Sequence, residues 1–245
     1  MTDAAMEPLV GTVKHHVRHL VVLTPAADWP AQLAAGTDLA AGLLRELERL
    51  EASGQALFPI KVTAATNGSA DPAAASNDVL VFPEMVRHRG VRSEHATALV
   101  ARYAGLDAAS VAAPAVGLAP TVGQPPTVGP LPAAEVLPGK HLLVCVHRGH
   151  DERCGDSGPP LLDALDQQLT AQGVEDVTLY GSSHVGGHRF AGCLLAFPSG
   201  DWYGRVSPSQ AAAVISECVL AERILTSHWR GRLGLTPEAQ TAAQV

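Results

Sequence analysis

The chain has 245 residues, of which 47% are hydrophobic and 17% are charged, and its formal net charge is −7. This length suits one large domain or two small ones, and the apolar fraction is ample for a buried core. The acidic balance argues against a protein that binds nucleic acid by bulk electrostatic attraction. The long uncharged stretch that includes residues 111–134 is too rich in Pro and Gly to span a membrane, and the first eight residues lack a secretory signal pattern. We therefore expect a cytoplasmic protein that binds neither nucleic acid nor membrane.

Residues 113–140 contain seven prolines and four glycines. No helix survives that density of residues that break helices, so this segment predicts an extended connection along the surface. It divides the chain into a front half, residues 1–112, and a back half, residues 141–245. We expect each half to be an α/β domain.

In the front half, a run of apolar residues predicts a strand over 17–23 and an amphipathic pattern predicts a helix over 37–52. Further expected elements are strands near 57–63 and 78–83 and a helix near 93–104. In the back half, the expected elements are a strand over 141–146, a helix over 159–173 that begins at Pro159, strands over 176–180, 192–197 and 201–206, and a helix over 208–225 with Ser207 as its N-cap. This β-α-β-β-β-α order is compatible with a small thioredoxin-like α/β domain.

Two loops of the back half carry residues that bind metals. Cys145 and Cys154 flank the first loop, and His184 and His188 lie in the second, which follows the strand over 176–180. A helix connects the two strands, so we expect them to be parallel and both loops to emerge at the same edge of the sheet. The sequence therefore predicts that two thiols and two imidazoles meet at this edge.

Four such ligands suit either a zinc ion or a two-iron cluster in which each iron takes two protein ligands. Zinc sites usually separate their cysteines by two to four residues, whereas eight residues separate Cys145 from Cys154. Gly186 and Gly187 lie between the histidines and disfavour the helix that carries such a pair in zinc fingers. Their backbone amides could approach the sulfur atoms closely, which favours a cluster.

The back half resembles the sucrase/ferredoxin-like family, whose C-terminal domain is a thioredoxin-like ferredoxin. The resemblance covers roughly residues 140–240, and its most specific stretch is HVGGHRFAG, residues 184–192. Further matching segments are VCVH at 144–147, RC at 153–154, YGRV at 203–206 and WRGR at 229–232. Weaker matches lie upstream, in EPLVGT at 7–12 and DWP at 28–30, although the cysteine expected before the first of these is absent.

The resemblance implies a [2Fe-2S] cluster, with one iron bound by Cys145 and Cys154 and the other by His184 and His188. Gly186, Gly187 and Arg189 would contact the cofactor. Two neutral imidazoles in place of two thiolates predict a higher reduction potential than that of an all-cysteine ferredoxin, with reduction coupled to proton uptake. The most economical interpretation is a thioredoxin-like ferredoxin domain that carries the cluster, preceded by a second thioredoxin-like α/β domain that is degenerate or used for docking.

The function predicted is electron transfer or redox sensing rather than catalysis, with a redox partner protein or a small molecule as electron donor or acceptor. No nucleotide-binding glycine motif follows a strand, so electrons must come from outside the chain. Two alternatives stay open, namely a structural Cys2His2 zinc module for protein interaction and a thiol oxidoreductase that uses Cys145 or Cys154.

The remaining cysteines and histidines receive structural interpretations. Cys193 and Cys218 lie in apolar segments and are expected in the core. His147 and His150 lie between the two predicted cysteine ligands, where they could bind the metal or donate hydrogen bonds to its ligands. We expect them instead to be solvated loop residues, as is usual for a loop histidine. No cysteine or carboxylate lies at ligand spacing from the histidines at the start of the first strand, so we expect them to be strand residues rather than metal ligands. These are His15, His16 and His19.

Overall fold

The structure, a computed structural model, describes residues 7–55, 57–67, 77–105 and 130–243. Ten strands of these residues form one mixed sheet in the order β10-β9-β8-β6-β7-β2-β1-β3-β4-β5. The strands are β1 Arg18–Leu23, β2 Ile60–Asn67, β3 Val79–Phe82, β4 Val86–His88, β5 Ala134–Val136, β6 Lys140–Cys145, β7 Val177–Ser182, β8 Leu194–Phe197, β9 Asp201–Tyr203 and β10 Trp229–Arg232. The helices are α1 Leu39–Ala52, α2 Ala96–Ala104, α4 Glu152–Gln172, α5 Ala211–Ala213, which continues as a π-helix over Val214–Leu220, and α6 Pro237–Ala242.

The two halves of the chain repeat one strand arrangement. In the back half, β6 pairs parallel with β7 and antiparallel with β8, which pairs antiparallel with β9. In the front half, β1 pairs in the same way with β2 and β3, and β3 with β4. The back half thus has the thioredoxin-like α/β arrangement that its sequence predicts. The antiparallel pairing of β2 with β7 joins both halves in one sheet. It stays a prediction that the front half is a degenerate thioredoxin-like domain.

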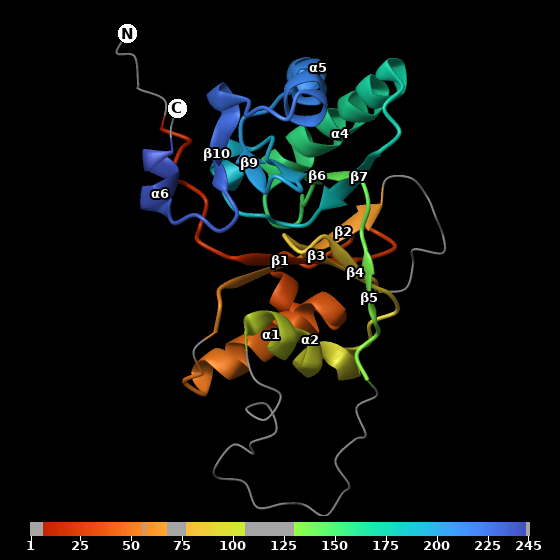
Figure 1. Cartoon of the computed structure of the whole chain (residues 1–245), viewed down its shortest axis with the longest axis vertical. Helices are drawn as coiled ribbons and strands as arrows, with labels where there is room; N and C mark the ends of the chain where they lie inside the picture. Colours follow the sequence, from red (N-terminus) through yellow and green to blue (C-terminus); the bar gives the residue numbers. More distant parts are fainter. Residues whose placement is uncertain (1–6, 56, 68–76, 106–129, 244–245) are drawn as a thin grey trace, which may run out of the picture.

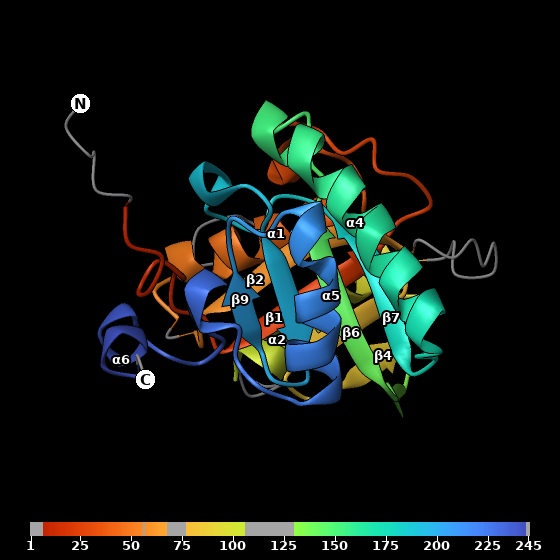
Figure 2. The ribbon, with the colours of Figure 1, turned by 90° about the horizontal axis from the view of Figure 1, so that it is seen from above.

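Helices and strands form four layers. The helices α1 and α2 lie at one end of the molecule and α4 and α5 at the other, with the strands between them (Figure 1). Seen from above, α4 and α5 lie in front of the strands and α1 and α2 behind them (Figure 2). The sheet folds back on itself, so that the faces without helices pack against each other. At their centre the rings of Phe82 and Phe197 stack with centroids 3.8 Å apart.

The central strands are buried on both faces, which explains their nearly continuous apolar sequences. In β6, Leu142 and Val144 pack toward the layer of α4, whereas Leu143 and Cys145 pack into the core between the two halves. Because successive side chains of a strand point to opposite faces, this alternation places the thiol of Cys145 in the central core. It lies there at the edge where β6 ends.

The prediction that the first helix of the back half begins at Pro159 is wrong. The helix α4 begins at Glu152, and Asp151 caps it by accepting a hydrogen bond from the backbone N–H of Arg153 at 3.0 Å. It continues through Pro159 and Pro160. Because proline is common in the first turn of a helix, two prolines inside a helix wrongly suggest that the helix begins there. Cys154 therefore lies in the first turn of α4 rather than in a loop.

Other differences concern short elements. The helix expected over 208–225 ends at Leu220, although Ser207 does precede it and shares a capping box with Gln210. The strands β4, β5 and β10 and the helix α6 were not predicted from the sequence. Of the proline-rich connection 113–140, residues 113–129 lie outside the described residues, and the rest includes β5, which pairs antiparallel with β4.

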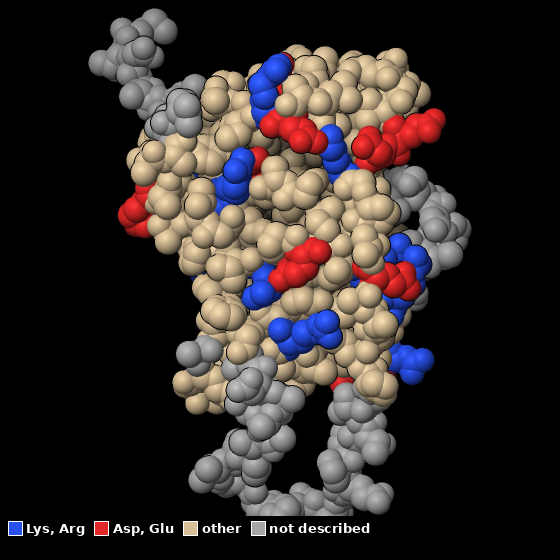
Figure 3. Space-filling view, viewed as in Figure 1, with Lys and Arg blue, Asp and Glu red and all other residues tan. Residues whose placement is uncertain are grey.

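Charged side chains of both signs alternate over the face shown in Figure 3. Elsewhere among the described residues, exposed partners form ion pairs such as Arg89 with Glu135 at 2.7 Å. Such pairs contribute little to stability. Within the described part of the chain, no helix is long and apolar enough to cross a membrane.

Buried neutral histidines predict a loss of stability in mild acid. Burial lowers the pKa of His16 and of His141 to about 4. Between pH 6.5 and about 4 the unfolded chain therefore binds more protons than the folded chain, so this stability is present above pH 6.5 and is lost as the pH falls. From pH 7.5 to 5.0 we expect each histidine to lower the free energy of unfolding by about 2 kcal/mol in urea titrations. A His141→Gln variant should show a correspondingly smaller fall, and an equal fall in both proteins would contradict this reading.

Candidate metal centre

The structure brings the two predicted loops together. The strands β6 and β7 are parallel, with Cys145 opposite Ser182 at their carboxyl ends, so both following loops leave the same edge of the sheet. Cys145 ends β6, and Cys154 lies in the first turn of α4. His184 follows β7, and His188 begins a short 3-10 helix over His188–Phe190.

The thiols of Cys145 and Cys154 are both buried and contact each other. A hydrogen bond from Cys154 lowers the pKa of Cys145 well below its ordinary value, and hydrogen bonds from His184 and from the backbone N–H groups of His147 and Val185 add to this effect. The same contact and burial raise the pKa of Cys154. The site thus stabilises a thiolate at Cys145.

The two predicted histidine ligands face each other across the second loop. The rings of His184 and His188 have centroids 5.4 Å apart, and the Nδ1 atom of each is buried without a hydrogen-bond partner. The other nitrogen of His188, Nε2, lies 3.9 Å from Oδ2 of Asp151. Asp151 in turn accepts two hydrogen bonds from the side chain of Arg153, which hold the pKa of its carboxyl group below the ordinary range. Because buried polar atoms rarely lack a partner, both Nδ1 atoms are positioned for a ligand.

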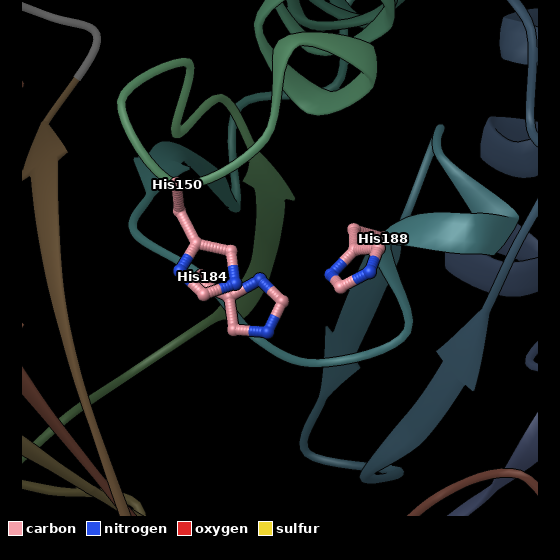
Figure 4. A group of neighbouring side chains, drawn as sticks. All are labelled: His150, His184 and His188. Carbon is pink, nitrogen blue, oxygen red and sulfur yellow. The ribbon is translucent and has the colours of Figure 1, made fainter. Parts of the chain in front are cut away.

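His150 joins this pair, although the sequence predicted a solvated loop residue. Its ring stacks on that of His184 at 3.6 Å, and potential ligand atoms of His150, His184 and His188 lie within 4.8 Å of one another (Figure 4). Its Nδ1 donates a hydrogen bond to the carbonyl oxygen of Ala31 at 2.7 Å. Since Nδ1 carries the proton, Nε2 is the free nitrogen. Sequence reasoning missed this residue because Ala31, which fixes the ring, belongs to the other half of the chain.

His147 is buried and has a structural role. Its Nε2 donates to the carbonyl oxygen of Trp29 at 3.2 Å, and its Nδ1 accepts the backbone N–H of His184 at 3.1 Å. Both ring nitrogens are therefore engaged, which leaves none for a metal. The side chain ties the front half to both loops of the site, and burial lowers its pKa.

Gly186 and Gly187 shape the loop between the histidines. Both have positive φ values, +102° and +78°, which glycine adopts without strain. A Cβ atom on Gly187 would lie 2.2 Å from the guanidinium group of Arg230, which donates a hydrogen bond to the carbonyl oxygen of Gly186 at 3.0 Å. Arg230 thus supports the loop at these two glycines.

The remaining candidates lie beside the site. Arg189 pairs with Glu7 at 2.9 Å, so it links the loop to the N-terminal segment. Cys193 is buried, as predicted, and its thiol donates to the carbonyl oxygens of Gly187 and Phe190, both at 3.3 Å. Burial raises its pKa to about 12, so it is a protonated core residue.

The pattern of the sucrase/ferredoxin-like family matches residues 9–231, so the chain belongs to that family. Altered inheritance of mitochondria protein 32 from Debaryomyces hansenii is 40% identical over 97 residues, which are 38% of this chain and 35% of that protein. Actin patches distal protein 1 from Saccharomyces cerevisiae is 28% identical over 94 residues, 33% of this chain and 30% of that protein. The matched region thus spans about a third of these relatives. Among solved structures, a thioredoxin-like [2Fe-2S] ferredoxin from Aquifex aeolicus is similar over 41% of this chain and 96% of its own, with a TM-score of 0.35 and 19% identity.

Proposed function

We propose that this chain transfers electrons or senses redox state through a [2Fe-2S] cluster bound by Cys145, Cys154, His184 and His188. One observation carries the proposal: two contacting buried thiols lie beside two histidines whose buried Nδ1 atoms have no partner. Two sulfur and two nitrogen donors supply two protein ligands for each of two irons. The residues present therefore fit the group.

The surrounding residues prepare this donor set. Hydrogen bonds to Cys145 favour the thiolate, which is the form that binds iron. Asp151 faces Nε2 of His188 and so favours the tautomer with the proton on that nitrogen, which leaves Nδ1 free. When bound, the cluster would supply reversible one-electron chemistry, and neutral imidazole ligands would set its potential above that of an all-cysteine cluster.

His188 marks the side from which a redox partner would approach. Its side chain is 41% exposed, whereas Cys145 and Cys154 are buried. We propose that a redox partner protein or a small-molecule donor or acceptor exchanges electrons at this edge. The chain itself would carry out no further chemistry on its partner.

Two other functions are tested by the same experiment. A zinc interaction module would use the same four residues without colour. A thiol oxidoreductase is favoured by the lowered pKa of Cys145, and its activity would be lost on alkylation without any need for iron.

The test is anaerobic purification with quantification of iron, acid-labile sulfide and zinc. We expect a red-brown wild-type protein with two irons and two sulfides per chain, as the cluster composition requires. Cys145→Ala and Cys154→Ala should lose both, since each removes a ligand. Cys218→Ala is the matched control, because Cys218 lies among the side chains that pack against the α4 layer, and it should keep its iron. A colourless zinc protein, or full iron content in Cys145→Ala, would refute the proposal.

A further inference from the structure

A cavity lies beside the loop that carries Gly186 and Gly187. Its volume is about 380 Å³, within the range of small-molecule sites. It opens between the two halves of the chain, and its walls come from the segment 12–16, α1, β2, the loop at 185–187, Trp202 and Arg230. None of the four proposed iron ligands lines it.

The polar wall of this cavity carries positive charge without a matching buried carboxylate. Lys61 lies beside Trp202, with Nζ 5.6 Å from the centre of the indole ring, and no ion pair of Lys61 exists among the described residues. Arg230 is 1% exposed, and its hydrogen bonds go to neutral groups, namely the oxygens of Thr12 and Gly186 and the thiol of Cys193.

Lys14 adds a third positive charge to the lining, and the acidic residue among the lining side chains is the exposed Glu51. Burial and the charge of Arg230 lower the pKa of Lys61 to about 8. Unpaired buried charge is costly, so such a group favours an anionic partner.

The rest of the lining is apolar and aromatic. Ile60, Val62, Val185 and Trp202 contribute hydrophobic surface next to the cationic wall. A hydrated inorganic anion would leave this surface unused, whereas a molecule with both a carboxylate and an apolar body would contact both walls. His15 and His16 also line the cavity, so these histidines belong to its wall rather than to a metal site.

We propose that this cavity binds a small organic acid, with its carboxylate paired to Lys61 in the field of Arg230 and its apolar body against Trp202. The proposal goes beyond the redox function and does not depend on which metal Cys145 binds. The bound acid would lie next to Gly186 and Gly187. Gly187 directly precedes the proposed ligand His188, and one residue separates Gly186 from the proposed ligand His184.

The test is calorimetric titration of the intact metal-bound protein with benzoate, and with benzyl alcohol as its uncharged analogue. We expect saturable binding of benzoate and none of benzyl alcohol. Lys61→Gln should weaken benzoate binding at least tenfold, and Lys61→Arg, which keeps the charge, should largely restore it. The matched control is Lys140→Gln, because Lys140 pairs with Glu222 at 3.0 Å outside this cavity. The benzoate affinity of this variant should stay within twofold of the wild-type value.

Three outcomes would overturn the proposal: no saturable benzoate binding by the wild type, equal affinity for benzoate and benzyl alcohol, or equal benzoate affinity of the wild type and Lys61→Gln. The first two need no variant, so they decide the matter even if Lys61→Gln fails to fold. Iron content, measured on the same samples, reports separately on the proposed function. An iron-free protein that binds benzoate would refute the cluster and leave the cavity proposal standing.

Discussion

A double variant with His184→Cys and His188→Cys is expected to retain a cluster whose reduction potential is lower by roughly 250 mV or more. Clusters with two histidine ligands span about −150 to +300 mV, whereas plant-type clusters with four cysteines lie near −400 mV. The physical reason is charge, because two thiolates make the centre more negative and so disfavour an added electron. An anaerobic redox titration followed by EPR measures the difference.

The matched control introduces a cysteine outside the site. In His228→Cys the replaced ring contacts the carbonyl oxygen of Gly204 through Nδ1 at 3.1 Å and none of the proposed ligands, so the potential should not change. A double variant with the wild-type potential and spectrum would show that the two histidines do not bind the metal. Loss of iron from the double variant, with the fold retained, would mean that the loop cannot place thiolates where the Nδ1 atoms lie.

Substitution of Gly158 by alanine is expected to lower the free energy of unfolding by about 3 kcal/mol and to reduce iron content. Gly158 lies inside α4 where the helix crosses the end of β6. An added Cβ atom would lie 2.2 Å from the carbonyl oxygen of Cys145 and 3.0 Å from Cα of Val146, and these are backbone atoms that cannot rotate away. The helix must therefore move off the strand, which displaces the two thiols relative to each other.

Gly42→Ala in α1 is the matched control for this substitution. Gly42 also lies inside a helix, but nothing lies within 4 Å of its added Cβ atom. Alanine there should stabilise the protein by up to about 1 kcal/mol, because it favours the helix without a clash. Urea denaturation of both variants checks the pair. If Gly158→Ala were as stable as the wild type, the close approach of α4 to β6 would be wrong.

The sequence was sufficient to predict most of the back half because its signals are local. The apolar run over 141–146 and the turn residues around it gave β6, and the crossover rule placed the loops of Cys145 and His184 at one edge. The start of α4 was missed because Pro159 resembles a first-turn residue. The true start is marked by the N-cap Asp151, whose side chain accepts a hydrogen bond from the backbone N–H of Arg153. The hydrophobic periodicity of the sequence does not reveal this contact.

The parts of the site that come from distant segments could not be predicted. The carbonyl oxygens of Trp29 and Ala31 hold His147 and His150, and both reach the site only because the sheet folds back on itself. Sequence distance conceals such contacts, so the sequence alone favours solvated positions for both histidines. The sequence marks Arg230 only as part of a segment that matches the family, because its hydrogen bond to Gly186 depends on the position of β10.

Pulsed EPR of the reduced wild-type protein tests the central claim most directly, because it counts the nitrogen nuclei bonded to iron. The proposed ligands Cys145, Cys154, His184 and His188 predict two strongly coupled nitrogens in the wild type and none in the double cysteine variant. A reduced iron–sulfur signal without strongly coupled nitrogen, or with the same couplings in both proteins, would contradict the assignment.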